Sequence, residues 1–288
     1  MIEVLDPGIY TSIQDSGRFG LYSNGVPKSG YMDHQSAQIA NLLLDNKLHT
    51  ALFECTSLGP TLKFHQPTHI CFSGALISPI VNNRTEVPIH NPFKINSGDI
   101  LSVGYHFIGN YSYLAISGGI NTKPFLKSRS MSRSVTPDFR IKKNQFFELN
   151  EGKVSYSKGV NVKLDRQILT NESIEVYAGQ EFKHLDQPQR KLLFNHEFKV
   201  LHSSNRIAYL IEPKIKNNLK PILSNPVLPG TIQLTPSGHL IVLMRDCQTS
   251  GGYPRILQLT DDAINIMAQK QPNSKIKFKL KGIPLESR

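Results

Sequence analysis

The chain has 288 residues, of which 39% are hydrophobic and 19% charged, and its formal net charge is +11. This composition excludes an intrinsically disordered chain and fits a globular protein of up to two domains. No apolar run approaches the roughly 18 residues of a membrane-spanning helix, and the start MIEVLDPGIY lacks the basic and apolar parts of a signal peptide. We therefore expect a cytoplasmic protein with no membrane partner.

The cysteines and the positive charge restrict the chemistry further. Cys55, Cys71 and Cys247 stand far apart without a CxxC pair, so we expect reduced thiols, no disulfide and no metal site. One polar, Ser-rich stretch is strongly basic and contains Lys123, Lys127, Arg129, Arg133, Arg140, Lys142 and Lys143. It could bind phosphate or an acidic protein partner, but a solvated loop is the simpler interpretation, and we expect no nucleic-acid partner.

Short apolar or alternating runs recur along the whole chain. In chain order they are IEVL, TLKF, HICFSG, DILSVGYHF, YSYLAIS, SIEVYAG, FKVLHS, TIQLT, HLIVLM and KIKFKL. Gly, Pro, Asn and Ser separate them, which predicts many strands joined by turns. The last run, KIKFKL, is predicted to be an edge strand whose lysines discourage edge-to-edge pairing. The sequence therefore indicates a mainly β fold.

Three helices are predicted among the strands. Asp33 is placed to cap HQSAQIANLLL, Pro188 to open QRKLLF, and Asp261 to cap DAINIMAQK. The composition shifts over residues 121–144, and a polar run follows at 150–171. We place a domain boundary near residue 170, which gives domains 1–170 and 171–288, and we expect a ligand site between them.

The stretch RDCQTSGGYPRI, residues 245–256, follows the apolar run HLIVLM directly. A strand that ends in acidic, thiol and polar residues and then passes two glycines presents side chains at a rim, where the backbone can approach a ligand closely. The alternative is a hairpin turn whose glycines only supply positive φ. Cys247 has no neighbouring His or Lys in the sequence, so we expect a small buried thiol and not a nucleophile.

Several strings, taken together, resemble the family of 5-oxoprolinase C subunits. They are PGIYTSIQDSGRFGLYSNGVPKSGYMD, IANLLLDN, LFECTSLGPTLKF, LAISGGI, SSNRIAYL, LPGTIQL and PSGHLIVLMRDCQTSGGYPRI. The family is also called biotin-dependent carboxyltransferase, allophanate hydrolase subunit 2 or kinase-inhibitor antagonist. The resemblance implies a cyclophilin-like β-barrel architecture with two subdomains.

The resemblance also implies partners and an activity. The chain would pair with a B subunit of the same family and could be joined by a third, the A subunit. The assembly would open the small amide 5-oxoproline to glutamate with ATP as co-substrate, and the chain alone would be inactive. Two alternatives stay open: a non-catalytic regulatory protein that antagonises a kinase inhibitor, and one half of a biotin-dependent carboxyltransferase. No MKM-type biotinylated lysine is present, so no covalent biotin is expected on this chain.

Matching the family motifs position by position gives candidate site residues. Asp246 would carry a proton or orient a water, and the polar group that would orient a small substrate is Gln14, Asn205, Gln248, Thr249 and Tyr253. Arg18, Arg206 and Arg255 would hold a carboxylate, a phosphate or carboxybiotin. The alternatives are that Asp246 caps a turn and that Arg18 and Arg206 pair with acids such as Asp15 or Asp33.

The chain departs from the family pattern at several positions. It has no glycine between Ile120 and Asn150, where the family has a Gly-rich segment, so this loop has less backbone freedom. Ala208 stands where the family has glycine, Leu210 where an arginine is usual, and Ser250 where a second threonine is usual. These changes suggest a diverged paralogue.

Overall fold

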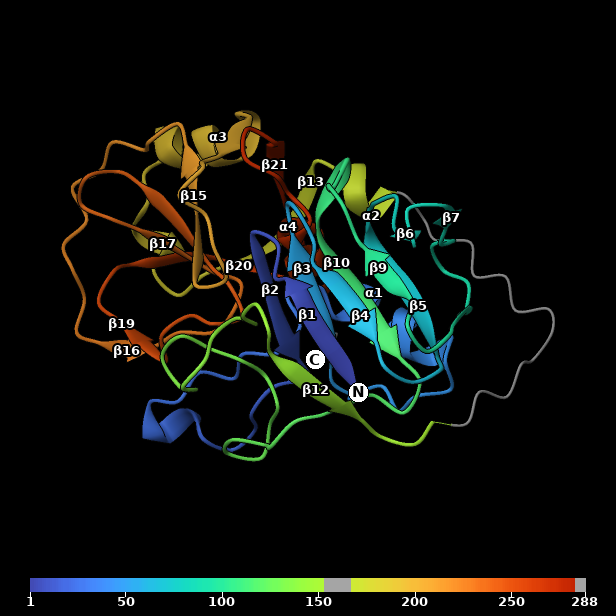
Figure 1. Ribbon diagram of the computed structural model, residues 1–288. Coiled ribbons are helices and arrows are strands. Elements are labelled where there is room, and N and C mark those ends of the chain that lie inside the picture. Colours follow the sequence, from blue (N-terminus) through green and yellow to red (C-terminus); the bar gives the residue numbers. More distant parts are fainter. Residues whose placement is uncertain (153–166, 283–288) are drawn as a thin grey trace, which may run out of the picture. The chain divides into compact units, whose positions relative to one another are not determined.

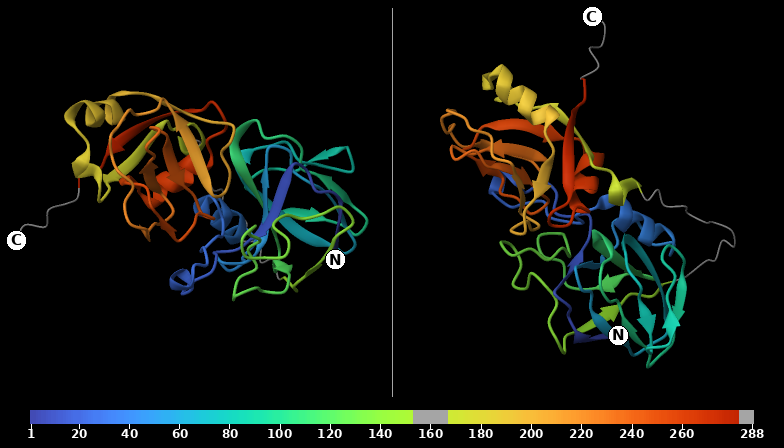
Figure 2. Two further views of the ribbon diagram at one scale, coloured as in Figure 1. Left: turned by 90° about the vertical axis from the view of Figure 1, so that its left-hand side faces the viewer. Right: turned by 90° about the horizontal axis from the view of Figure 1, so that it is seen from above.

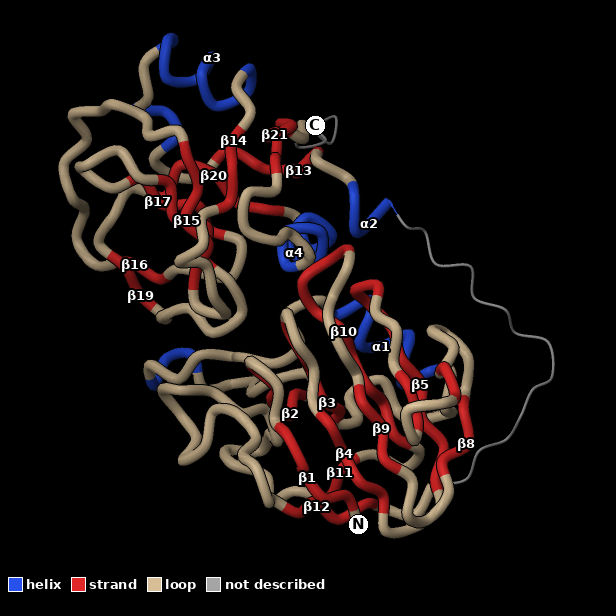
Figure 3. The backbone as a smooth tube through the Cα atoms, turned by 45° about the horizontal axis from the view of Figure 1, so that its top comes forward, coloured by secondary structure: helices blue, strands red, loops and turns tan. Residues whose placement is uncertain are grey.

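The computed structural model describes residues 1–152 and 167–282 and is mainly β, with few helices (Figures 1 and 3). The chain divides into two compact units, Met1–Phe19 with Lys28–Thr170 and Gly20–Pro27 with Asn171–Arg288. The second unit thus takes eight residues from near the amino terminus, which the sequence did not suggest. Residues 153–166 of the polar run that we noted before the expected boundary lie outside the described residues.

The first unit contains two antiparallel sheets. The seven-stranded sheet has the order β11-β12-β1-β4-β9-β6-β7, and the five-stranded sheet has the order β2-β3-β10-β5-β8. The strands of the larger sheet are β1 (Ile2–Asp6), β4 (Thr61–Phe64), β6 (Ile80–Val81), β7 (Thr85–Glu86), β9 (Ile100–Ser102), β11 (Ile120–Asn121) and β12 (Phe146–Leu149). Those of the smaller sheet are β2 (Tyr10–Gln14), β3 (Leu52–Thr56), β5 (Thr68–Leu76), β8 (Phe93–Ile95) and β10 (Ile108–Ile116).

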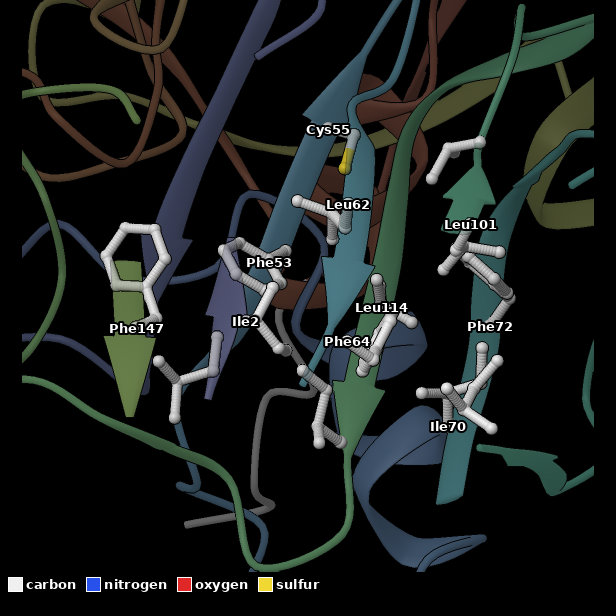
Figure 4. Close-up of a cluster of buried hydrophobic side chains, with 14 of the residues drawn as sticks. Ile2, Phe53, Cys55, Leu62, Phe64, Ile70, Phe72, Leu101, Leu114 and Phe147 are labelled. Atoms are coloured by element: carbon white, nitrogen blue, oxygen red, sulfur yellow. The ribbon is translucent and has the colours of Figure 1, made fainter. Parts of the chain in front are cut away.

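Alternating side chains of both sheets build the core of this unit (Figure 4). In β1, Ile2 and Val4 are fully buried while Glu3 between them is not, as expected for a strand with one face on a core. Phe53 of β3 and Phe147 of β12 meet edge to face with ring centroids 5.6 Å apart. β1 therefore has one buried face, whereas most residues of β3, β5 and β10 are buried on both faces.

The predicted first helix is confirmed as α1 (His34–Leu42), and Asp33 caps it. The Asp33 carboxylate accepts hydrogen bonds from the Ser36 backbone N–H at 3.1 Å and from the Ser36 hydroxyl at 2.6 Å. The side chain thus satisfies a backbone donor that the first turn of a helix leaves without a partner. A four-residue helix, α2 (Gln167–Thr170), ends the first unit.

The second unit is a closed seven-stranded barrel of order β13-β20-β17-β18-β15-β14-β21, which confirms the barrel architecture (Figure 2). Its strands are β13 (Ser173–Ala178), β14 (Phe198–Val200), β15 (Ala208–Glu212), β17 (Thr231–Leu234), β18 (Leu240–Leu243), β20 (Arg255–Leu259) and β21 (Lys275–Leu280). β16 (Asn225–Pro226) and β19 (Ser250–Gly251) pair as a separate two-stranded sheet. The helices of this unit are η1 (Tyr22–Asn24), η2 (Phe182–His184), α3 (Gln187–Asn195) and α4 (Asp261–Ala268).

The prediction that KIKFKL forms an edge strand is wrong. This segment is β21, which pairs with β13 on one side and β14 on the other and so closes the barrel. Ile276 and Phe278 point into the core, while the lysines between them are exposed. The lysines therefore lie on the outer face of a barrel strand, and the local pattern alone could not distinguish that position from an edge.

The predicted helices of the second unit are present, but the cap of α4 differs from the prediction. α3 begins at Gln187 with Asp186 as its cap in a capping box with Gln189, and Pro188 lies in its first turn. α4 is capped by Thr260, whose hydroxyl accepts from the Ala263 N–H at 3.2 Å. Thr260 is the last residue with an extended backbone, and Asp261 is already the first helical residue. Asp261 is therefore not the cap. Among the described helices, none is long and apolar enough to cross a membrane.

The position of the α4 cap can be tested by substitution. We expect Thr260→Ala to lower the free energy of unfolding by about 1 kcal/mol, because the Ala263 N–H loses its acceptor. Thr260→Ser keeps the oxygen and should restore most of this stability in urea unfolding. A larger loss in Asp261→Ala than in Thr260→Ala would contradict this assignment.

Candidate functional site

Two motifs that are far apart in the sequence meet at one end of the barrel. β15 and β18 are antiparallel neighbours with Ala208 opposite Leu243, so the start of β15 lies beside the end of β18. The pairing continues beyond the strands, because the Asp246 N–H donates to the Arg206 carbonyl at 2.9 Å. The loop before β15 and the stretch RDCQT after β18 therefore form a single rim.

Arg206 and Asp246 form a buried, bidentate ion pair at this rim. Nε of Arg206 lies 2.9 Å from Oδ2 of Asp246, and Nη2 lies 3.0 Å from Oδ1. The two side chains are only 5% and 7% exposed. Because both carboxylate oxygens accept from the guanidinium, Asp246 holds Arg206 in a fixed orientation. Asp246 is thus a pairing partner of Arg206.

The two loops of this rim contain three of the polar residues that we expected to orient a substrate, Asn205, Gln248 and Thr249. The Asn205 carboxamide oxygen accepts from the N–H groups of Ile207 at 2.8 Å and Ala208 at 3.3 Å and so shapes the turn before β15. Gln248 is exposed, and Thr249 is half-buried with its carbonyl accepting from the Val227 N–H at 3.1 Å. Their roles toward a substrate stay predictions.

The second half of the stretch, GGYPR, leads away from Asp246. The Leu234 N–H donates to the Pro254 carbonyl at 3.0 Å, and Leu234 pairs with Leu240 at the start of β18. Asp246 follows the end of that same strand, so the two halves of the stretch lie at opposite ends of β18. Tyr253, which is 39% exposed, comes directly before Pro254 and therefore belongs with this second group.

The two glycines of the stretch do not supply positive φ, which removes the hairpin-turn alternative. Gly251 belongs to β19, and neither Gly251 nor Gly252 is among the glycines with positive φ. A Cβ on Gly251 would lie 2.5 Å from Nε2 of Gln233. A side chain at Gly251 would therefore require the Gln233 carboxamide to shift.

Arg255 is engaged with an acid that the sequence interpretation missed. Its Nε lies 3.0 Å from Oε2 of Glu181, its Nη2 lies 3.0 Å from Oε1, and its backbone N–H donates to Oε2 at 2.9 Å. Its guanidinium also donates to the Gln180 side chain and, at 3.1 Å, to the Pro226 carbonyl. Hydrogen bonds from Arg255 hold the pKa of Glu181 below its ordinary value. Arg255 thus anchors residues 180–181, and its role as a ligand-binding residue stays a prediction.

The amino-terminal motif QDSGR organises the basic, Ser-rich segment of the first unit. The Asp15 carboxylate accepts from the Gly17 N–H at 2.8 Å, the Ser128 and Ser130 hydroxyls at 2.6 and 2.7 Å, and the Arg129 N–H at 2.6 Å. Four donors on one buried carboxylate fix both the turn after β2 and the segment opposite it. This segment lies where we expected the family's Gly-rich loop. The hydrogen bonds from the Ser128 and Ser130 hydroxyls to the Asp15 carboxylate hold it in place.

Gln14 and Arg18 contact the same segment. Nε2 of Gln14 donates to the Met131 carbonyl at 2.9 Å, while Nε of Arg18 donates to the Phe125 carbonyl at 3.2 Å and Nη2 donates to the Ser130 carbonyl at 2.5 Å. Both side chains are buried. The structure thus gives Gln14 and Arg18 a positioning role in the first unit, and their predicted contact with substrate stays a prediction, as does a site shared by the two units.

Tyr22 is a further residue that the sequence interpretation missed. It comes from the segment Gly20–Pro27 that belongs to the second unit, and its hydroxyl donates to the Val227 carbonyl. It also lies beside the Cys247 thiol, whose pKa is raised to about 12 by burial and by the charge of Asp246. A thiol with that pKa is a poor nucleophile at neutral pH, in agreement with the sequence interpretation. Within residues 1–152 and 167–282, no three His, Cys, Asp or Glu side chains gather as metal ligands would.

The Arg206–Asp246 pair generates a prediction about stability. We expect Arg206→Met alone to lower the free energy of unfolding by about 3–5 kcal/mol, because it leaves the Asp246 carboxylate buried without its guanidinium. The double variant Arg206→Met/Asp246→Leu should lose less than this single variant in chemical denaturation. The exposed ion pair of Lys275 with Glu197 is the control, and Lys275→Met should leave the free energy of unfolding nearly unchanged. Additive losses in the double variant would contradict the pairing.

The Glu181–Arg255 pair generates a prediction about pH. The folded-state pKa of Glu181 is depressed from 4.5, so its contribution is fully present above pH 4.5 and is lost as the pH falls through the lower folded value. We expect Glu181→Gln to lower the free energy of unfolding at neutral pH. The difference in this free energy between the variant and the unsubstituted chain should become smaller in acid, as measured by urea unfolding across this pH range. A constant difference at every pH would contradict an ionised Glu181.

Comparison with known proteins places the chain in a family. A model of the carboxyltransferase domain, subdomain A and B, matches residues 24–280. The chain is 28% identical to the C subunit of 5-oxoprolinase from Haemophilus influenzae, over 96% of this chain and 90% of that protein. It is equally identical to the C subunit of 5-oxoprolinase from Escherichia coli, over 93% and 87%. Urea amidolyase of Lachancea kluyveri is 40% identical over 129 residues, which are 44% of this chain and 7% of that protein.

Solved structures agree with this assignment. The Kluyveromyces lactis urea carboxylase superposes with a TM-score of 0.85 at 29% identity, covering 96% of this chain and 27% of that one. The urea amidolyase of the same yeast gives a TM-score of 0.85 at 27% identity, covering 96% of this chain and 18% of that one. This chain therefore corresponds to one part of those larger proteins, and it belongs to the family of carboxyltransferase domains with subdomains A and B.

Proposed function

We propose that the chain is the C subunit of a multisubunit, ATP-dependent 5-oxoprolinase that opens 5-oxoproline to glutamate. The observation that carries the proposal is the match to two proteins named as 5-oxoprolinase C subunits. Each match covers nearly the full length of this chain and of the relative. The urea amidolyase and urea carboxylase matches instead cover small parts of longer chains. A counterpart of a named C subunit is expected to act with separate partner chains, a B subunit and a third, the A subunit.

The chemistry explains why partners and ATP are needed. A lactam carbonyl is a poor electrophile until its oxygen becomes a leaving group such as phosphate, and the charge that then develops needs preorganised donors, each worth about 3–4 kcal/mol. Arg206 supplies such a donor group at the barrel rim, and the bidentate contact with Asp246 fixes its direction. In this proposal Arg206 holds an anionic group of the substrate, and Asp246 keeps the guanidinium in place. ATP is a co-substrate of the assembled complex, and no biotin is attached to this chain.

A second function is favoured by two observations. The 40% identity to urea amidolyase over 129 residues and the carboxyltransferase family model suit one half of a carboxyl-transfer enzyme, with biotin carried on another protein. In that case Arg206 would hold the carboxylate of carboxybiotin, for which a guanidinium fork is suited. A third function, that of a regulatory protein that antagonises a kinase inhibitor, predicts a stable complex without turnover.

Reconstitution tests the main proposal. The chain is mixed with the purified A and B partners, 5-oxoproline and ATP, and glutamate is assayed against mixtures that lack one component. We expect glutamate only from the complete mixture. A stable but silent complex would favour the regulatory function, and carboxyl transfer from a biotinylated protein without 5-oxoproline turnover would favour the second function.

The role of the barrel rim is tested in the same assay. We expect Asp246→Asn to lower kcat about a hundredfold or more, because an amide cannot hold the guanidinium through two charged contacts. Complex formation on a sizing column should persist. Asp186→Asn is the matched control, because Asp186 is an exposed cap residue of α3, and its kcat should be unchanged. Equal kcat values for the two variants would remove Asp246 from the mechanism.

A further inference from the structure

A cavity of about 530 Å³ opens on the second unit, and none of its lining residues belongs to the Arg206–Asp246 rim. One part of its lining, with Glu181 and His184, comes from the connection that follows β13, and another part, residues 218–222, comes from the connection that follows β15. Pro254 of the stretch GGYPR completes it. This volume lies within the range of about 300–1,000 Å³ that is typical of small-molecule sites.

The lining is held in place by contacts outside the cavity. Arg255 fixes the position of Glu181 through its guanidinium and its backbone N–H. The Ile222 N–H donates to the Gly252 carbonyl at 2.9 Å, and the Asn217 carboxamide bridges residues 215 and 235 through their carbonyls at 3.1 and 3.0 Å. The cavity is therefore largely preorganised, which lowers the entropy cost of binding a ligand there.

The charges in the cavity select among ligand classes. The Glu181 carboxylate accepts three hydrogen bonds, all from Arg255, whereas a carboxylate can accept about four, so Oε1 retains acceptor capacity toward the cavity. Lys220 is exposed in the same lining, and within the described part of the chain no acid forms an ion pair with it. His184 and Asn218 add further donors. Glu181 and Lys220 thus place charges of opposite sign in one lining, and Arg255 pairs with Glu181 from outside the cavity.

We propose that this cavity binds an α-amino dicarboxylate of the glutamate class, with the ligand ammonium on Glu181 and its carboxylates on Lys220, His184 and Asn218. A zwitterion with a second carboxylate satisfies both signs of charge in the lining, and Leu219 and Ile222 contact its methylene groups. Binding requires neither a partner chain nor ATP, so the site can be tested whether or not the chain belongs to a 5-oxoprolinase.

Calorimetric titration of the purified full chain with L-glutamate tests the site. We expect saturable binding that Lys220→Ala weakens at least about tenfold, because a charge-assisted contact is lost. Lys214→Ala is the matched control, because Lys214 is an exposed lysine of the same connection that does not line the cavity, and its affinity should be unchanged. No saturable binding, or equal weakening by both substitutions, would overturn the proposal.

The role of Glu181 is tested with a second ligand. Glutarate has both carboxylates but no ammonium, so we expect it to bind at least about tenfold more weakly than L-glutamate. Glu181→Gln should weaken L-glutamate binding and leave glutarate binding unchanged or stronger. Glutarate binding as tight as that of L-glutamate would overturn the proposal. Because the glutarate comparison uses the unsubstituted chain, it stands even if Glu181→Gln does not fold.

Discussion

A buried charge must be met by a donor or a counter-charge, and this constraint organises the functional motifs of the molecule. Asp246 is met by Arg206, Glu181 by Arg255, and Asp15 by two hydroxyls and two backbone N–H groups. Except for the Gly17 N–H on Asp15, each of these partners comes from a distant part of the sequence. The charged residues of these motifs therefore hold separate loops together through hydrogen bonds and ion pairs.

This constraint changes the interpretation of the candidate site. Arginines in such motifs suggest anion binding, yet Arg255 directs its donors to Glu181, Gln180 and a backbone carbonyl. Arg206 is oriented by Asp246 and is the arginine that the proposed mechanism uses. The stretch after β18 then serves two places, because its acidic half builds the barrel rim and its glycine–proline half helps to line the cavity beside Glu181. A single motif can thus connect two chemically different regions of one barrel.

Local sequence patterns predicted the strands and helices better than they predicted which elements pair with one another in the tertiary structure. Alternating apolar residues correctly indicated strands such as β1 and β21, and the Asp33 cap is a local hydrogen bond that a short window contains. The same pattern could not show that β21 closes a barrel, because closure depends on pairing with β13, about a hundred residues away in the chain. Glu181 and Tyr22 were missed because their partners are set by tertiary structure. Glu181 lies in no recognisable motif, and the string that contains Tyr22 does not show that its hydroxyl reaches Val227.

The segment Gly20–Pro27 has a consequence for how this protein can be divided. It leaves the first unit after Phe19, contributes the Tyr22 hydroxyl to the Val227 carbonyl, and returns at Lys28. A fragment that begins at Asn171 would lack this segment and would leave the Cys247 region without the tyrosine that lies against it. The two units are thus interleaved along the chain, and recombination or gene fission at a single point would separate one barrel from a piece of its own surface.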